Sequence, residues 1–373
     1  MATRKEKAMQ PRQKTQVTLW GKFNAAREAM NEALIERDGE IDVVLTALIC
    51  GEHPLLVGPP GTAKSLLLDS LADLIKAPKF DYLLGKFTDP MELFGPVDIT
   101  KLKAGQCERV VTKMMPEATL AFMDEIFKAS SAILNTLLKI LNERKFKYGQ
   151  QEIDCPLRIC VAASNEWPDE QEELGALFDR FLLRKIVNPI GVSSRARLLW
   201  KRNHKPEFKY QLSSADLDKA QLEAATMDWT EEAKDGLMAI LDELNRNGIA
   251  PGDRRMYKSV GVAQAFAWLN GHDEVQMEDL EILKHCLWVD PSEQPTKTAE
   301  IVARIANPIG HAINEKLGQA NEIMRKNDPT EAVPKLQEIQ KEIDALPDNP
   351  RKDAAYNWVG KQIEKTYNKV LGR

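Results

Sequence analysis

The chain has 373 residues, of which 43% are hydrophobic and 29% are charged, and its formal net charge is −5. This composition is typical of a soluble globular protein with room for two or three domains, and no apolar run is long enough to span a membrane. The negative balance argues against a protein that coats nucleic acid broadly, although it does not exclude a basic ring pore.

Basic side chains are concentrated at the start of the chain. Several Lys and Arg residues lie within the first 14 residues, and no apolar segment follows them directly as a signal peptide would require. We therefore expect residues 1–20 to form a flexible basic tail.

The cysteines are scattered, without a CxxC pair and without clustered histidines. They are Cys50, Cys107, Cys155, Cys160 and Cys286. A set of this kind is typical of reduced thiols in a cytoplasmic protein and argues against a zinc site.

Strands and helices alternate from residue 21 to about residue 190, beginning with a helical stretch over 23–37. This alternation predicts an α/β core, with a parallel sheet covered by helices on both faces. Most of the expected strands are almost continuously apolar, as strands buried on both faces are. They are 54–58, 80–84, 119–124, 157–163 and 183–187.

A glycine-rich loop joins the first expected strand to a helix over 66–75. It reads Gly58-Pro59-Pro60-Gly61-Thr62-Ala63-Lys64-Ser65, and Leu66 follows it. A loop that opens a helix aims backbone N–H groups and the positive end of the helix dipole at one point, which suits a polyphosphate. Lys64 would hold the β- and γ-phosphates and Ser65 would ligate Mg²⁺. These residues predict a site for a nucleoside triphosphate.

Ala63 departs from the usual pattern of this loop, which has Gly before the Lys. We place Ala63 at the start of the helix, where ordinary helical dihedrals apply, and expect its methyl group to be tolerated. The alternative for the whole loop is a glycine turn before a surface helix.

Polar residues follow the third and fourth expected strands. Asp124 and Glu125 end an apolar strand, and alternation would aim Asp124 at the Mg²⁺ shell and Glu125 at the attacking water. Asn165 ends the next strand and would hold that water or sense the γ-phosphate. Taken singly, the acidic pair could be a solvated turn or a helix cap, and Asn is a common turn residue. Their combination with the loop indicates hydrolysis.

Arg180 and Arg184 lie where a helix gives way to the last expected strand. A guanidinium at this point would lie on the subunit surface and could reach a neighbouring subunit's nucleotide, as an arginine finger does. We favour Arg180 and keep Arg184 as the rival. Arg180 could instead pair with Asp179 or Glu173.

Two segments interrupt the core. Residues 93–117 fit neither a clean strand nor a long helix, and residues 145–156 carry the hairpin signal Tyr148-Gly149. Insertions of this kind face a pore or contact another subunit. Their Lys101, Lys103 and Lys147 could touch an acidic substrate, or could simply be solvated.

Beyond residue 190 only helical periodicity remains. It predicts an all-α lid over 191–290, with helices at 230–245, 253–269 and 277–289. Arg254 and Arg255 open the second of these helices, where one arginine could swing over the γ-phosphate. Their charge opposes the helix dipole, which favours function over a merely solvated helix start.

The last segment, 291–373, predicts a helical extension of three or four helices, without a chemical motif. We expect breaks near Pro308, Pro329, Pro334 and Pro347.

In this order, the motifs resemble those of the AAA+ ATPases, and the individual strings are similar to the MoxR branch, close to the RavA type. The resemblance is densest from Gly58 to Arg184. The matching strings are Ala63-Lys64-Ser65, Leu93-Phe94-Gly95-Pro96, Met123 to Ala129, Ala132 to Leu138, Leu141 to Arg144, Ala162 to Glu166 and Asp179-Arg180.

The resemblance implies a role for each candidate residue. It implies Walker A for Lys64 and Ser65, Walker B for Asp124 and Glu125, sensor 1 for Asn165, the arginine finger for Arg180 and sensor 2 for Arg254. The more common Ser-Pro-Arg form of sensor 2 is missing from this chain, so Arg255 stays open.

The resemblance also implies a five-stranded core with a helical lid, and a ring that is often hexameric. Partners of such proteins commonly carry von Willebrand factor A domains. We therefore expect a cytoplasmic, Mg²⁺-dependent ATPase that acts on partner proteins like a chaperone, with Glu125, Asn165, Arg180 and Lys64 catalytic.

A DNA-acting ring, such as a helicase or loader, would share this core. A noncatalytic scaffold that binds ATP would share only the nucleotide cradle, the loop over 58–65. The complete catalytic set disfavours such a scaffold.

Overall fold

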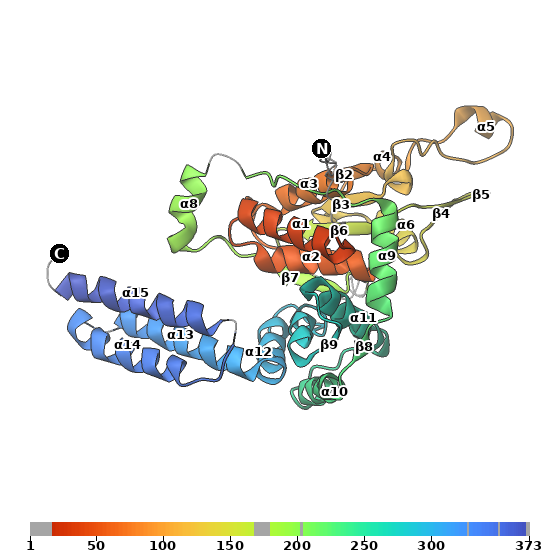
Figure 1. Cartoon of the computed structure of the whole chain (residues 1–373). Coiled ribbons are helices and arrows are strands. Elements are labelled where there is room, and N and C mark those ends of the chain that lie inside the picture. Colours follow the sequence, from red (N-terminus) through yellow and green to blue (C-terminus); the bar gives the residue numbers. More distant parts are fainter. Residues whose placement is uncertain (1–16, 168–179, 202–203, 327, 350, 371–373) are drawn as a thin grey trace, which may run out of the picture.

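The computed structural model describes residues 17–370 except 168–179, 202–203, 327 and 350 (Figure 1). Most of the expected basic tail lies outside the described residues, as do Asp179 and Glu173. The tail was expected to reach residue 20, but α1 (Leu19–Ala33) already begins at Leu19, with Thr18 as its cap.

A five-stranded parallel sheet lies at the centre of the fold, as predicted. Its strands follow the order β2-β3-β6-β1-β7. They are β1 (Pro54–Val57), β2 (Lys79–Leu83), β3 (Leu120–Asp124), β6 (Ile159–Ser164) and β7 (Leu183–Ile186). Because all pairs are parallel, the carboxyl ends of β3, β6 and β1 lie side by side at one edge of the sheet.

Helices cover both faces of this sheet, and strand alternation divides the apolar residues between two clusters. Leu56 points into the cluster that contains α1, α2 (Asp38–Cys50) and α3 (Lys64–Ile75). Its neighbours Leu55 and Val57 point into the opposite cluster, with α6 (Ser131–Glu143). Such two-sided burial is the reason that β1, β3 and β6 lack polar alternation, whereas the edge strand β2 is only partly covered.

Both predicted interruptions are present, and they extend away from the sheet in Figure 1. The second is a hairpin of β4 (Lys145–Tyr148) and β5 (Gln151–Asp154). The first consists of short helical turns joined by irregular chain: α4 (Pro90–Phe94), α5 (Ile99–Lys103) and η1 (Met115–Glu117). Its strand content is one isolated bridge between Val97 and Arg109.

We propose that residues 191–225, which were expected to be part of the lid, form a linker between the core and the lid. It contains η3 (Val192–Ser194), α8 (Arg195–Trp200) and α9 (Ser214–Ala225). The lid follows with α10 (Glu231–Arg246), α11 (Asp253–Asn270), η4 (Met277–His285) and α12 (Gln294–Ala306).

Two details of the lid differ from the expected all-helical pattern. Residues 277–285 form a 3₁₀ helix, and β8 (Asp228–Trp229) pairs with β9 (Glu274–Val275) in a two-residue parallel ladder. Two residues are too few to produce a periodic pattern, so the ladder could not be predicted. Thr230 caps α10, as its position suggests, by accepting a hydrogen bond from the Ala233 N–H.

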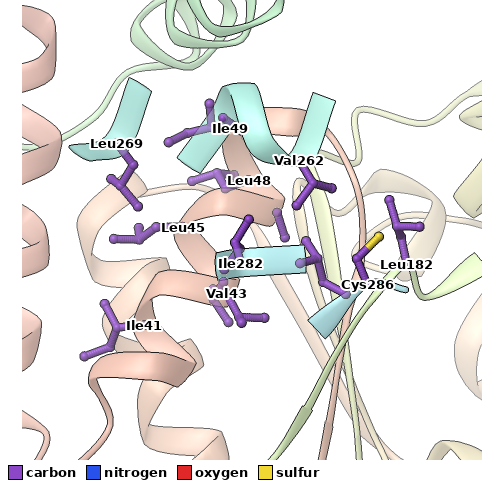
Figure 2. Packing of buried hydrophobic residues seen from close by; sticks show 14 of the residues in the cluster. Ile41, Val43, Leu45, Leu48, Ile49, Leu182, Val262, Leu269, Ile282 and Cys286 are labelled. Atoms are coloured by element: carbon purple, nitrogen blue, oxygen red, sulfur yellow. The ribbon is translucent and has the colours of Figure 1, made fainter. Parts of the chain in front are cut away.

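The lid packs directly on the core through α2, whose apolar side chains point in several directions (Figure 2). Leu45, Leu48 and Ile49 of α2 lie in one cluster with Val262 of α11 and Ile282 of η4. Burial of several such side chains, at about 1.5–3 kcal/mol each, ties the lid to the core.

The extension consists of α13 (Pro308–Lys326), α14 (Pro329–Asp344) and α15 (Lys352–Val370). These helices share an apolar cluster of their own, whereas α12 packs into the cluster of the lid. We therefore propose that the extension begins after α12. Among the described helices, none combines the length and apolarity needed to cross a bilayer.

Pro334 does not break the chain as we expected, because it lies inside α14. Its missing N–H removes one hydrogen bond near the start of that helix, and the apolar residues Leu336, Ile339 and Ile343 that follow it are buried.

Candidate functional site

Three of the predicted motifs meet at the carboxyl edge of the sheet, where β3, β6 and β1 end. The Lys64 ammonium donates to the carbonyl oxygens of Gly58 (2.6 Å) and Pro59 (3.2 Å) and to Asn165 Oδ1 (3.1 Å). The Asn165 amide donates in turn to Glu125 Oε1. One amide therefore connects the lysine of the loop to the glutamate at the end of β3.

Two positions of the loop, Gly58 and Gly61, favour glycine for different structural reasons. A Cβ on Gly58 would lie 2.1 Å from the Val187 carbonyl oxygen, so the close approach of the chain after β7 requires glycine there. Gly61 has a φ of 77°, in the left-handed region that favours glycine. Leu66, included among the expected ligand residues, packs partly against the core.

Ala63 does not have the helical dihedrals that we expected. Its φ is 66° and its ψ is 22°, a left-handed conformation that caps α3 before Lys64. The methyl group is tolerated at a cost, because the left-handed conformation is disfavoured by about 1–2 kcal/mol for an L-residue. This strain explains why glycine is usual at this position.

Glu125 is the second strained residue, with a φ of 54°, and it is only 5% exposed. Because of this left-handed conformation, the Glu125 side chain points in a different direction from that of Asp124, the last residue of β3. Its Oε2 atom is buried, lies 3.3 Å from the Lys128 ammonium, and has no hydrogen-bond partner among the described residues. A buried carboxylate with one oxygen unbonded can accept a proton.

Lys64 lies in a mixed electrostatic environment. Burial lowers the pKa of its ammonium below the ordinary value, while the charges of Asp124 and Glu125 act in the opposite direction. The lowered pKa means that the cost of burying the ammonium outweighs the attraction of the two carboxylates.

The residues that we expect to hold Mg²⁺ fit that ion. Ser65 is exposed in the first turn of α3, and Asp124 is half-buried with Oδ1 accepting the Glu125 N–H at 3.0 Å. Hydroxyl and carboxylate oxygens are the hard ligands that Mg²⁺ prefers, together with phosphate oxygens and water. The described residues contain no group of three His, Cys, Asp or Glu side chains that could hold a metal alone, so phosphate oxygens would have to complete this site.

Arg37, which was not among the predicted site residues, supports the loop from the turn between α1 and α2. Its Nε donates to the Thr62 carbonyl oxygen at 3.0 Å, and the side chain is buried. The neighbouring Glu36 carboxylate accepts the Gly191 N–H at 2.6 Å and the Ser194 hydroxyl, and these two hydrogen bonds lower the pKa of Glu36. A single Arg between two helices carries no sequence signal for this role.

Two of the four candidate arginines are enclosed at the junction of core and lid. Arg184 is 1% exposed, lies 4.0 Å from the Trp288 ring centroid and donates to the Trp288 carbonyl. Arg255 is 3% exposed and donates to the carbonyl oxygens of Leu182 (3.2 Å) and Cys286 (2.8 Å). Both side chains join the lid to the core and are closed to a ligand.

The other two, Arg180 and Arg254, line one small polar pocket of about 160 Å³. Its remaining lining residues are Gly51, Glu52, His53, Leu141, Asn142, Arg144 and Lys258. His53 directly precedes β1 and Arg180 precedes β7, so the pocket lies at the amino edge of the parallel sheet. The loop follows β1 at the opposite edge. The structure therefore brings Lys64, Glu125 and Asn165 together, and separately Arg180 and Arg254.

Comparison with known proteins gives two family matches. Residues 21–224 match the model described as the MoxR domain in the MoxR-vWA-beta-propeller ternary systems, and residues 234–302 match the AAA lid domain. The first match covers the core and linker, and the second covers most of α10 to α12.

Individual relatives agree with these matches. An uncharacterized protein of Methanocaldococcus jannaschii is 38% identical over 325 residues, covering 82% of this chain and 84% of its own. Chaperone MoxR1 of Mycobacterium tuberculosis is 24% identical over 279 residues, covering 68% and 72%.

A solved structure shares the fold. It is a Cytophaga hutchinsonii protein assigned as an ATPase, with a TM-score of 0.62 and 18% identity, covering 78% of this chain and 95% of its own. The RavA type stays a prediction. From the family models and these relatives, the chain belongs to the MoxR family of AAA+ ATPases.

Proposed function

We propose that this protein hydrolyses ATP in a ring of identical subunits and uses the reaction to remodel partner proteins. The observation that carries the proposal is the division of the catalytic set between two edges of one sheet. The four residues of β1 span about 13 Å, so a triphosphate at Lys64 cannot also reach Arg180 and Arg254 of the same subunit. A neighbouring copy has to supply them.

Within one subunit, Glu125 acts as the general base. It accepts a proton from water while the water oxygen bonds to the γ-phosphorus and the bond to the β–γ bridging oxygen breaks. Asn165 holds Glu125 through Oε1, and we assign the proton to Oε2, which lies 3.3 Å from the Lys128 ammonium. The same amide contacts Lys64, so the base and the phosphate-binding cation keep one relative position.

Cationic groups from two subunits stabilise the negative charge on the transferred phosphoryl group. Lys64 and the backbone N–H groups of its loop belong to the subunit that binds ATP, and the guanidinium groups of Arg180 and Arg254 belong to the next. When bound through Ser65 and Asp124, Mg²⁺ supplies positive charge to the β- and γ-phosphate oxygens. A finger arginine contributes about 10³–10⁵ to the rate in related reactions.

The partner class follows from the family. The matching model describes a MoxR domain that works with a vWA protein and a β-propeller. We propose a protein partner with a von Willebrand factor A domain, contacted by the insertion over 93–117 and the β4–β5 hairpin.

Subunit mixing tests the proposal. Lys64→Ala removes the cradle and leaves the arginine pocket, whereas the double variant Arg180→Ala/Arg254→Ala removes the pocket cations and leaves the cradle. Each should be nearly inactive alone. A one-to-one mixture should recover about a quarter of the wild-type rate per subunit, because that share of the head-to-tail contacts joins an intact cradle to an intact pocket.

The matched control mixes Lys64→Ala with Glu125→Gln, a variant that binds ATP without turning it over. Both defects lie in the cradle, so this mixture should stay inactive. Failure of the first mixture to recover, with an active wild type, would rule out action between subunits. A wild type that binds ATP without turnover would indicate a scaffold.

A further inference from the structure

We propose that Asn142 and the ion pair of Glu52 with Lys258 are positioning residues, which hold Arg254 of the lid beside Arg180 of the core. The lid of one subunit then responds to the nucleotide bound by its neighbour. This inference rests on the proposed function, because it requires that the pocket receives a neighbour's γ-phosphate.

Two polar contacts fasten the first turns of α11 to the core. Arg254 Nη2 donates to Asn142 Oδ1 at 3.0 Å, at the end of α6. Lys258 Nζ donates to both carboxylate oxygens of Glu52, at 2.6 and 2.7 Å, just before β1. Arg254 and Lys258 are four residues apart, so they share one face of the helix. That face is turned toward the pocket, since both residues line it.

The pocket carries an excess of positive charge. Its cations are Arg144, Arg180, Arg254 and Lys258, and among the lining residues the one carboxylate, Glu52, is bound to Lys258. The Arg144 guanidinium donates to the carbonyl oxygens of Gly51 (2.9 Å) and Leu141. Nε and Nη1 of Arg180 are buried without a hydrogen-bond partner among the described residues. Buried donors of this kind favour an anion.

Asn142 is suited to orient Arg254 without neutralising the positive charge of its guanidinium group. An amide oxygen accepts one hydrogen bond and leaves the guanidinium with its full charge, whereas a carboxylate would neutralise it. The pocket volume of about 160 Å³ is several times the roughly 30 Å³ of a water molecule, which leaves room for a terminal phosphate group.

Coupling follows from the origin of two of the pocket cations, Arg180 and Arg254. Arg180 belongs to the core and Arg254 to the lid, so an anion between them favours the arrangement in which Arg254 of α11 stays beside Asn142 of α6. Because coupling between two equilibria is reciprocal, the same contacts make the position of this lid affect ATP binding by the neighbour.

The first test separates positioning from folding. We expect Asn142→Asp to lower kcat about tenfold with little change in KM, because the cradle that binds ATP is unaltered while Arg254 is neutralised. Asn142→Ala should lower kcat less. Glu143→Gln, on the same turn but outside the pocket lining, is the matched control and should retain the wild-type kcat. Equal kcat for Asn142→Asp and the control would overturn the inference.

The second test observes the lid directly. An isotopically labelled Lys64→Ala subunit, which lacks the ammonium for its own nucleotide, is mixed with unlabelled Glu125→Gln subunits and ATP. We expect slower hydrogen exchange at the backbone amides of residues 255–260 of the labelled subunit, and loss of this effect when it also carries Asn142→Asp.

Two results would count against the inference: exchange that ATP leaves unchanged although the unlabelled subunits bind it, and slowing that survives Asn142→Asp. Either result, together with recovered turnover in the mixing experiment, would reject the positioning role alone. Absence of that recovery would reject the proposed function.

Discussion

At the cradle, two residues that are not glycine hold left-handed conformations, Ala63 with a φ of 66° and Glu125 with a φ of 54°. Each costs about 1–2 kcal/mol relative to an ordinary conformation. Strain of this size persists where the surroundings determine the geometry, and here both residues aim a functional group: Ala63 starts the helix that carries Lys64, and Glu125 turns its own carboxylate toward Asn165.

Ala63→Gly should therefore raise the free energy of unfolding by about 0.5–1 kcal/mol, since relief of strain exceeds the backbone entropy that glycine adds to the unfolded chain. Urea denaturation measures this change. Gly61→Ala is the matched control with the opposite sign, because Gly61 is left-handed and a methyl there meets no atom within 4 Å. An Ala63→Gly variant less stable than wild type would contradict the strain at this position.

Among the elements, the turn between α1 and α2 has a role beyond connection. Arg37 holds the Thr62 carbonyl of the loop, and Glu36 holds Gly191 and Ser194 of the linker. One short turn therefore contacts both the nucleotide cradle and the segment that leads to the lid. Its backbone is constrained as well, since Glu36 has a φ of 53°.

Arg37→Ala should weaken ATP binding about tenfold, because the Thr62 carbonyl loses a charged donor and the loop its lateral support. A fluorescent ATP analogue titrated into each variant gives the dissociation constants. Arg27→Ala is the control, since Arg27 pairs with Asp42 at 2.7 Å on the same helices without touching the loop. Equal affinities for the two variants would show that the Arg37 contact is dispensable.

For the whole molecule, the buried His53 and the half-buried His285 link stability to pH. Burial, followed in size by the charge of Arg144, lowers the pKa of His53 well below 6.5. Burial, with Lys185 and Lys284 nearby, does the same to the pKa of His285. His53 Nδ1 accepts the Cys160 N–H, and Nε2 lies between the Leu141 carbonyl oxygen at 3.2 Å and Arg144 Nη1 at 2.5 Å.

The sign of the pH effect follows directly. Below about pH 6.5 the unfolded chain binds protons at both histidines that the folded chain does not, so stability falls as the pH falls. We expect the free energy of unfolding to decrease from pH 7.5 to pH 5.5, measured by urea denaturation at constant ionic strength. His53→Asn should reduce this dependence. A pH-independent stability over that range would contradict neutral burial of these rings.

The central sheet could be predicted from the sequence because β1, β3 and β6 are short apolar runs, and burial on both faces leaves that pattern regardless of strand order. The same holds for Lys64, Asp124, Glu125 and Asn165, since parallel strands bring their following residues to a common edge. The conformation of Ala63 could not be predicted, because it depends on the path of the loop from β1 to α3 and not on the helix propensity of alanine.

The chain order of the motifs was therefore enough to identify an α/β nucleotide cradle and a family, because local patterns persist through any packing of the elements. The grouping of Arg180 with Arg254, and the enclosure of Arg184 and Arg255, depend on how α11 and η4 pack against α2. Contacts between residues so far apart in the chain arise from the burial of shared apolar surface, which leaves no periodic signal at the arginines themselves.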